Sequence, residues 1–267
     1  MKRDYKYVVF DLDGTLLNDD KKISCENENA IYKLRQNGIH IIIATGRKFR
    51  DVTKYLCQLN MKEKDYFICE DGGSVRDYKG DIIFQNKALL MSDLGYIVSL
   101  GKMDLSIITE FTDYYYTSSY LKKVIFSFVF RYLPKFQNTR FISNIKDIPQ
   151  NVKVEKIRTR KLPEQYVISK MKKRYCVHKV FHKYLDITSK GTNKFFAIEF
   201  LVHYRNICNC DDILYFGDDI NDIECFRNLA NTVAMKNATK EVKDIAKYII
   251  GTNQTNEIST FIDDLLE

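Results

Sequence analysis

A chain of 267 residues is long enough for one large domain or two modest ones, and its hydrophobic share of 45% and charged share of 29% are typical of soluble globular proteins. No apolar run is long enough to span a bilayer, and the first residues lack the apolar stretch of a secretory signal. Seven scattered cysteines indicate reduced thiols, so we expect a cytoplasmic protein with no membrane partner. The net charge of +7 leaves an anionic substrate or partner open.

The first predicted element is a short buried strand over residues 7–10, which ends in two carboxylates, Asp11 and Asp13. Residues two apart in a strand share a face, so both side chains can start out in the same direction. Gly14 then allows the chain to turn away. Two carboxylates this close repel each other unless a cation lies between them or one keeps a proton. A polar turn would explain Asp-Gly alone, but the full run Asp-Leu-Asp-Gly-Thr is more specific.

A second strand is predicted over residues 39–44, because this run of mostly β-branched residues is typical of a parallel strand covered on both faces. The helix before it is capped by Ser24, and another helix over residues 49–59 follows Thr45 and Gly46. A strand, a turn of small residues and a helix start direct backbone N–H groups and a hydroxyl toward an anion.

The middle of the chain is basic, since residues 79–187 hold 20 Lys and Arg residues against 9 Asp and Glu. Short strands are predicted here over 81–84, 124–130 and 175–181, and helices over 93–101, 147–156 and 163–173. Solvated basic faces and sheet aromatics explain this composition better than nucleic-acid binding, so we expect no nucleic-acid partner. His178 and His182 are four apart, but residues 177–181 are predicted as a strand, where this spacing does not form the two-ligand face of a helix.

A lysine at the start of a helix is the next candidate. Lys194 precedes a predicted helix over residues 195–204, and a cation at this positive end of a helix indicates an anion nearby. Lys190 is the rival, because it precedes a glycine. We favour Lys194, since the helix follows it directly.

A second acidic cluster follows a fourth predicted strand over residues 213–216. Asp218, Asn221 and Asp222 stand here in the run Gly-Asp-Asp-Ile-Asn-Asp. Carboxylates at this density repel each other, and oxygen-rich clusters are what Mg²⁺ selects. A magnesium site is therefore predicted at the ends of the strands.

Taken in order, these stretches resemble the four motifs of the haloacid dehalogenase superfamily, and in particular its Cof-type branch. The resemblance implies an α/β fold, with a Rossmann-like doubly wound parallel sheet in a core formed by residues 1–78 and 188–267. An inserted α+β cap domain that selects the substrate is expected over residues 79–187. Asp71 departs from the pattern, because the branch usually has Asn there; we expect it to point away from the phosphate site or to contact the sugar side of a substrate.

The resemblance also implies the activity, a Mg²⁺-dependent phosphomonoesterase that works through an aspartyl-phosphate intermediate. Asp11 is the implied nucleophile, and Asp13 is the implied general acid and base, for which its pKa must be raised toward neutrality. The remaining implied roles are phosphate binding by Thr45, Gly46 and Lys194, metal binding by Asp11, Asp13, Asp218 and Asp222, and positioning by Asn221.

The implied substrates are small phosphomonoesters such as sugar phosphates, with pyridoxal phosphate and flavin mononucleotide among those accepted. Two alternatives stay open: a phosphomutase or phosphotransferase of the same superfamily, and a non-catalytic sensor of a phosphorylated ligand. The presence of Asp13 favours the hydrolase, because a protein that only binds has little reason to keep a general acid. The oligomeric state is not predicted.

Overall fold

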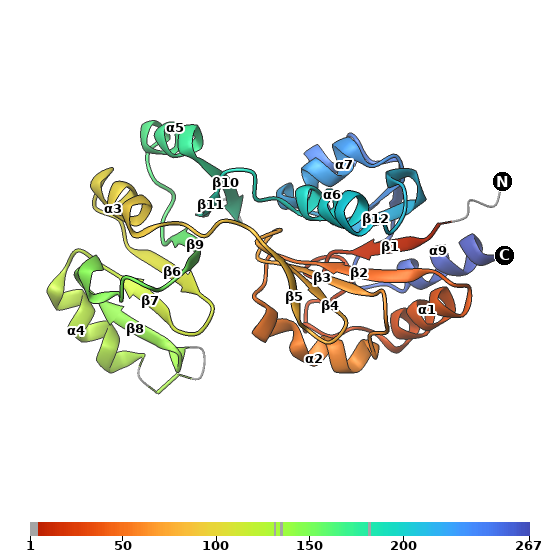
Figure 1. Ribbon diagram of the computed structural model, residues 1–267, viewed down its shortest axis with the longest axis horizontal. Helices are drawn as coiled ribbons and strands as arrows, with labels where there is room; N and C mark the ends of the chain where they lie inside the picture. Colours follow the sequence, from red (N-terminus) through yellow and green to blue (C-terminus); the bar gives the residue numbers. More distant parts are fainter. Residues whose placement is uncertain (1–4, 131, 134–135, 181–182) are drawn as a thin grey trace. The chain divides into compact units, whose positions relative to one another are not determined.

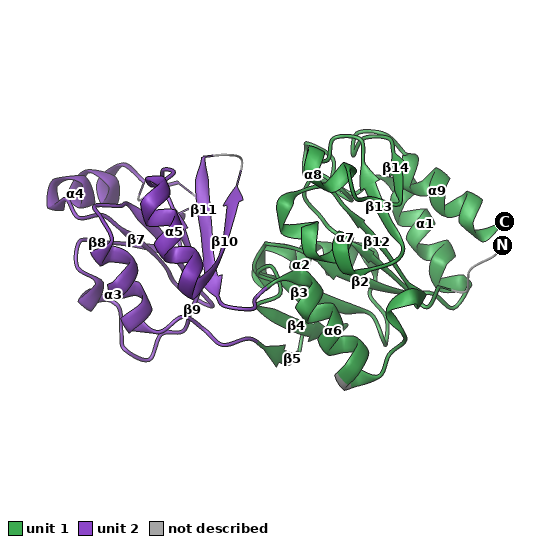
Figure 2. Cartoon of the chain, turned by 90° about the horizontal axis from the view of Figure 1, so that it is seen from above, with its two compact units in different colours: residues 1–85, 193–267 green, residues 86–192 purple. Residues whose placement is uncertain are grey.

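The computed structural model describes residues 5–267 except 131, 134–135 and 181–182. The chain forms two compact units, one of residues 1–85 with 193–267 and the other of residues 86–192 (Figure 2). Each unit has a sheet of its own. None of the described helices combines the length and the apolar character that crossing a membrane would require.

The sheet of the first unit has eight strands in the order β14-β13-β12-β1-β2-β3-β4-β5. Pairing is parallel from β14 to β3, and β4 and β5 are added antiparallel at one edge. The strands are β14 (Tyr248–Ile250), β13 (Thr232–Met235), β12 (Ile213–Gly217), β1 (Tyr7–Phe10), β2 (His40–Ala44), β3 (Tyr66–Cys69), β4 (Ser74–Asp77) and β5 (Ile82–Gln85).

Helices cover both faces of this sheet, which confirms the predicted doubly wound core (Figure 1). In β1 the side chains alternate, so that Val8 and Phe10 join one core cluster while Tyr7 and Val9 join the other. The first cluster is completed by α1 (Cys25–Gln36), α2 (Phe49–Leu59) and α9 (Glu257–Leu266). The second is completed by α6 (Lys194–Arg205), α7 (Ile223–Asn228) and α8 (Lys240–Lys243).

Parallel pairing brings the carboxyl ends of β1, β2, β3 and β12 to the same edge of the sheet. Phe10, the last residue of β1, lies beside Phe216 of β12 and Ile43 of β2. The polar residues that follow these strands in sequence therefore meet in space, as is usual for ligand sites of open α/β sheets.

The second unit has a mixed sheet in the order β10-β11-β9-β6-β7-β8, in which only β7 and β8 pair in parallel among the described strands. The strands are β6 (Leu105–Thr109), β7 (Asp113–Tyr116), β8 (Thr139–Ile142), β9 (Val154–Thr159), β10 (Tyr175–Val180) and β11 (Tyr184–Ser189). One apolar cluster joins a face of this sheet to α3 (Met91–Ser99) and α5 (Gln165–Arg174).

Two predictions for this unit are wrong. The strand predicted over residues 124–130 is the helix α4 (Tyr120–Val129), which Ser119 caps by accepting a hydrogen bond from the Lys122 N–H. The helix predicted over 147–156 is not observed: a short 3-10 turn ends at Asp147, and β9 begins at Val154 and pairs between β11 and β6. In both stretches the tertiary context overrides a weak local preference. Phe181, which we had placed at the end of a strand, and His182, which follows it, lie outside the described residues.

Candidate active site

Three carboxylates gather at the edge where β1 and β12 end. Asp11 follows β1, Asp218 follows β12, and Asp222 ends the single turn Ile220–Asp222. One carboxylate oxygen from each of the three lies within 4.8 Å of the others. Asp11 and Asp222 are buried, at 4% and 0% exposure. Three carboxylates at this separation, two of them buried, require cations close by.

Lys194 supplies one of these cations. Its ammonium Nζ lies 2.5 Å from Asp11 Oδ1 and 2.6 Å from Asp222 Oδ1, and its side chain is fully buried. Burial alone would lower the pKa of Lys194, but the charges of Asp11 and Asp222 outweigh it and hold the pKa well above its ordinary value. Lys190, the rival in the sequence, is exposed and belongs to the other unit. The geometry therefore favours Lys194.

Both carboxylate oxygens of Asp222 accept two hydrogen bonds each from groups of the cluster. Its Oδ1 accepts a hydrogen bond from the Tyr215 hydroxyl at 2.6 Å as well as from Lys194, and its Oδ2 accepts from the backbone N–H groups of Asp218 and Asp219 at 2.9 and 3.1 Å. These contacts fix both Lys194 and the loop that carries Asp218. The sequence did not indicate Tyr215, because its position inside an apolar strand is also that of an ordinary core residue.

Asp218 is held from the opposite side of the cluster. Its Oδ1 accepts a hydrogen bond from the Thr15 hydroxyl at 2.8 Å. Burial and the charge of Asp222 raise the pKa of Asp218 to about 7. Gly14, at φ +84°, lies so close that a Cβ on it would overlap the Asp218 carboxylate. A glycine is thus required here both by the backbone conformation and by the contact with Asp218.

Asp13 lies at the same edge but in a different environment. Arg47 donates two hydrogen bonds to its carboxylate, at 2.6 and 2.7 Å, and Lys21 donates a third at 2.8 Å. Burial would raise the pKa of Asp13, but these hydrogen bonds and charges hold it below its ordinary value. This is opposite to the raised pKa expected from the sequence, and the reason is Arg47, to which the sequence reasoning had given no role.

Thr45 and Gly46 lie where β2 ends. Thr45 is buried, and its hydroxyl oxygen accepts the backbone N–H of Arg47 at 3.1 Å. A Cβ on Gly46 would lie 2.7 Å from Asp71 Oδ1, so a larger residue would displace that carboxylate.

One of our two expectations for Asp71 is wrong, because its side chain does not point away from this region. It is buried, and its Oδ1 accepts a hydrogen bond from Asn221 Nδ2 at 2.8 Å. It also contributes to the raised pKa of Lys194. An Asp therefore takes part in the network around the cluster at a position where Asn was expected.

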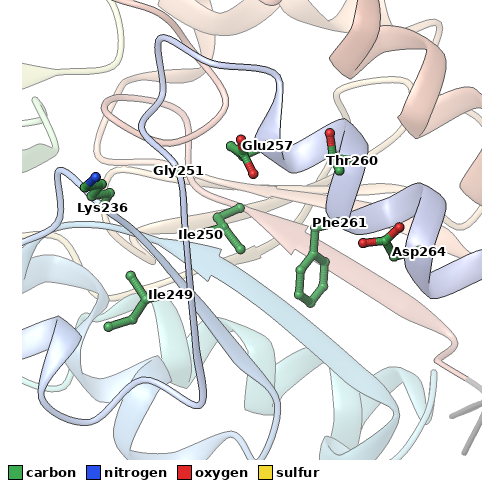
Figure 3. Close-up of a pocket in the computed structure, with 8 residues that line it drawn as sticks. All are labelled: Lys236, Ile249, Ile250, Gly251, Glu257, Thr260, Phe261 and Asp264. Atoms are coloured by element: carbon green, nitrogen blue, oxygen red, sulfur yellow. The ribbon is translucent and has the colours of Figure 1, made fainter.

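A separate hollow of about 510 Å³ lies between β14 and α9 (Figure 3). Ile249, Ile250 and Phe261 give it an apolar floor, and Lys236, Glu257 and Asp264 surround them. None of the carboxylates of the cluster lines this hollow. The acidic edge of the sheet, not the hollow, holds the groups that could perform chemistry.

Comparison with known proteins gives a consistent result along the whole chain. The sequence model described as haloacid dehalogenase-like hydrolase matches residues 8–262. The 5-amino-6-(5-phospho-D-ribitylamino)uracil phosphatase YwtE of Bacillus subtilis is 29% identical over 291 residues, which cover 98% of each protein. Phosphoglycolate phosphatase 1 of Saccharolobus solfataricus is 25% identical over 264 residues, covering 98% of this chain and 96% of that protein.

Solved structures share the fold. A phosphatase of the same superfamily from Bacteroides thetaiotaomicron superposes with a TM-score of 0.81 at 19% identity, covering 98% of this chain and 95% of that one. A Thermotoga maritima protein gives a TM-score of 0.77 at 24% identity, with 97% of each chain covered. At these identities the likeness shows the fold, with a mainly parallel core sheet and a separate cap sheet.

Proposed function

This chain belongs to the haloacid dehalogenase-like hydrolases and is a phosphatase of small phosphorylated metabolites, and on that premise we propose that it cleaves sugar phosphate-like monoesters with Mg²⁺ through an aspartyl-phosphate on Asp11. The observation that carries the proposal is the buried cluster of Asp11, Asp218 and Asp222 around Lys194 at the carboxyl ends of the strands.

The residues present fit a divalent cation. The cluster has three carboxylates and one buried lysine. The pKa values of Asp11 and Asp218 are raised, chiefly by burial. Lys194 lowers both values and the neighbouring carboxylates raise them, and the net shift is upward. A hard cation with oxygen ligands would relieve this excess of negative charge. We assign Asp11, Asp218 and the Asp13 carbonyl as ligands. Asp222 has both oxygens in hydrogen bonds, so its role is to hold the surrounding groups.

A bound Mg²⁺ would neutralise phosphoryl charge and orient the transferring group. The protein groups then divide the work. Lys194 and the Thr45 hydroxyl stabilise the negative oxygens, while a carboxylate oxygen of Asp11 attacks phosphorus and the bond to the leaving oxygen breaks. Asp13 gives a proton to the leaving alkoxide, which departs as the alcohol. Arg47 and Lys21 hold the pKa of Asp13 low, so this step requires the negative charge of the bound phosphate to raise that pKa until Asp13 takes up a proton.

The second half-reaction returns the enzyme to its starting state. Asp13, now a carboxylate, takes a proton from a water molecule whose oxygen attacks the phosphorus of the aspartyl-phosphate. Inorganic phosphate leaves, the Asp11 carboxylate is restored, and Asp13 again holds a proton. The contacts of Asp13 with Arg47 and Lys21 suit this second role, because they favour the ionised carboxylate.

The second unit, residues 86–192, serves in this proposal as the cap that selects the leaving group. Its basic balance supports an anionic substrate. The relatives suggest where to begin, since one acts on 5-amino-6-(5-phospho-D-ribitylamino)uracil and another on phosphoglycolate. The first of these is a phosphorylated polyol and thus lies within the sugar phosphate-like class.

The deciding experiment is phosphate release from a panel of monoesters with Mg²⁺ and with EDTA. The panel holds sugar phosphates, phosphoglycolate, 5-amino-6-(5-phospho-D-ribitylamino)uracil, pyridoxal phosphate and flavin mononucleotide. Asp11→Asn should lower kcat by several orders of magnitude, and Asp20→Asn, which alters an exposed carboxylate nine positions after Asp11, should leave it unchanged. Turnover by Asp11→Asn within about tenfold of wild type, with deamidation excluded by mass spectrometry, would contradict the nucleophile.

A further inference from the structure

The helix α4 of the second unit presents an apolar half to solvent. At about 100° per residue, six of its side chains fall within about half of the helix circumference. They are Tyr120, Leu121, Val124, Ile125, Phe128 and Val129. All six are exposed, and Leu121 and Phe128 reach 69% and 76%. Tyr132 and Leu133, just beyond the helix, are exposed as well. A contiguous apolar surface of this kind is unusual on a protein that binds only small molecules.

The opposite half of α4 fixes which side faces outward. The Phe126 ring packs edge-on against Tyr115 of β7, with 5.4 Å between the ring centroids. Phe130 packs against Phe136 and against Phe141 of β8, at 4.8 and 6.2 Å. The helix is thus anchored beside β7 and β8 by an aromatic cluster (Figure 1). Because these contacts fix the inward half of α4, its apolar half faces outward.

The stretch of sequence that carries this surface is basic. From Tyr114 to Lys146 inclusive, the sequence contains six basic residues and no acidic one. Lys122 lies beside the apolar half and makes an exposed ion pair of 3.2 Å with Asp104. Such a pair contributes little to stability, because water and salt screen the attraction. A basic stretch of sequence that carries an exposed aromatic and aliphatic helix face complements an anionic surface.

We propose that α4 lies flat in the interface of an anionic phospholipid membrane, with its apolar half among the lipid headgroups and upper chains. A helix that lies in the interface needs no long apolar run. The expectation of no membrane partner rested on the absence of such a run, and that absence does not exclude an interfacial helix. Lipid also demands no matched hydrogen bonds from the apolar half. Ser127, at its border, already donates its hydroxyl to the Val124 carbonyl at 2.9 Å.

A second copy of the chain fits this surface less well. Two copies meeting through α4 would bring the same basic stretches together. A stable protein interface also uses roughly 20–30 residues a side, many more than this single ten-residue helix offers.

The test is co-sedimentation of the full-length protein with vesicles of phosphatidylserine and phosphatidylcholine in equal parts, compared with phosphatidylcholine alone. Binding should require phosphatidylserine and weaken as salt is raised. The double substitution Leu121→Gln and Phe128→Gln should weaken it at least about tenfold. Tyr32→Gln on α1, which removes a side chain of 60% exposure outside α4, should bind as wild type does.

Circular dichroism and phosphate release by the double variant establish that it is folded, since neither residue belongs to the acidic cluster. Failure to bind phosphatidylserine vesicles, or binding that the double substitution leaves unchanged, would overturn the proposal. Concentration-dependent dimers in light scattering, lost in the double variant while no vesicles are bound, would overturn it in favour of a second copy.

Discussion

Replacing Lys194 with Met removes the cation from the centre of the candidate site while keeping most of the volume of the side chain. The Lys194 ammonium is fully buried and lies 2.5 and 2.6 Å from the carboxylates of Asp11 and Asp222. Breaking a buried ion pair by removing one partner costs about 3–5 kcal/mol, because the remaining charge is left uncompensated. At about 2–4 °C per kcal/mol, the melting temperature should fall by about 6–20 °C.

The assay is thermal unfolding followed by circular dichroism, in EDTA and in Mg²⁺. A mildly alkaline buffer is needed, because the raised pKa of Asp11 would otherwise let this carboxyl take up a proton and reduce the loss. Mg²⁺ should stabilise Lys194→Met more than wild type, since the cation would replace part of the lost positive charge. The turnover of phosphomonoesters should fall by at least about tenfold.

Lys190→Met is the matched control, because Lys190 is exposed and is the rival lysine in the sequence. Its effect on stability should stay within about 0.5 kcal/mol, as is usual for surface positions. If Lys194→Met melted together with Lys190→Met and kept wild-type turnover, the account of Lys194 as the cation of the cluster would be wrong.

Three further outcomes follow from the site. Arg47→Gln should raise the pKa of Asp13 and so move the acidic limb for single-turnover hydrolysis of the aspartyl-phosphate to higher pH, because the base of this second half-reaction must be ionised. Burial and a neighbouring carboxylate raise the pKa of Asp218 to about 7, so between pH of about 4 and about 7 the folded protein keeps a proton that the unfolded chain loses. In EDTA, the free energy of unfolding should therefore fall over this pH range, by at most about 1.4 kcal/mol per pH unit. Asp218→Asn should reduce this slope. Gly14→Ala should cost about 1–2 kcal/mol through its positive φ and should also lower turnover, whereas Gly38→Ala, at φ +76° with no atom within 4 Å of its Cβ, should lower stability alone.

Each of these outcomes has a result that contradicts it. An acidic limb that stays in place in Arg47→Gln would separate this arginine from the ionisation of Asp13. An equal pH slope in Asp218→Asn would mean that other groups cause the dependence. Equal turnover in Gly14→Ala and Gly38→Ala would show that the close approach of Gly14 to Asp218 has no consequence for catalysis.

The local pattern of the sequence was sufficient for the core of the fold. Apolar runs over residues 7–10, 39–44 and 213–216 predicted strands that are observed as β1, β2 and β12, because strands buried on both faces need apolar residues throughout. The helix over 49–59 is observed as α2 with the same bounds. Since parallel strands end at one edge of a sheet, the placement of the first and last acidic motifs close together also followed from the pattern.

The second unit was harder to predict, because its elements are short and only partly buried. Residues 124–130 have the β-branched and aromatic composition of a strand, but the Ser119 cap and the packing of Phe126 on Tyr115 stabilise the helix α4. Residues 154–159 form a central strand although the sequence before them suggested a helix. Here the partners of each segment, not its own preference, decide the structure.

The order of the motifs was enough to predict which functional groups follow the strands: carboxylates, a lysine and small residues, in an order that resembles the haloacid dehalogenase superfamily. Only the tertiary structure decided which groups meet. Arg47 and Asp13 are 34 residues apart, Asn221 and Asp71 are 150 apart, and Lys194 reaches Asp11 across 183 residues. The charge state of each carboxyl depends on these neighbours, because burial and nearby charges shift pKa values more than local sequence does. For this reason the lowered pKa of Asp13 and the raised pKa of Asp218 became visible only in the folded chain.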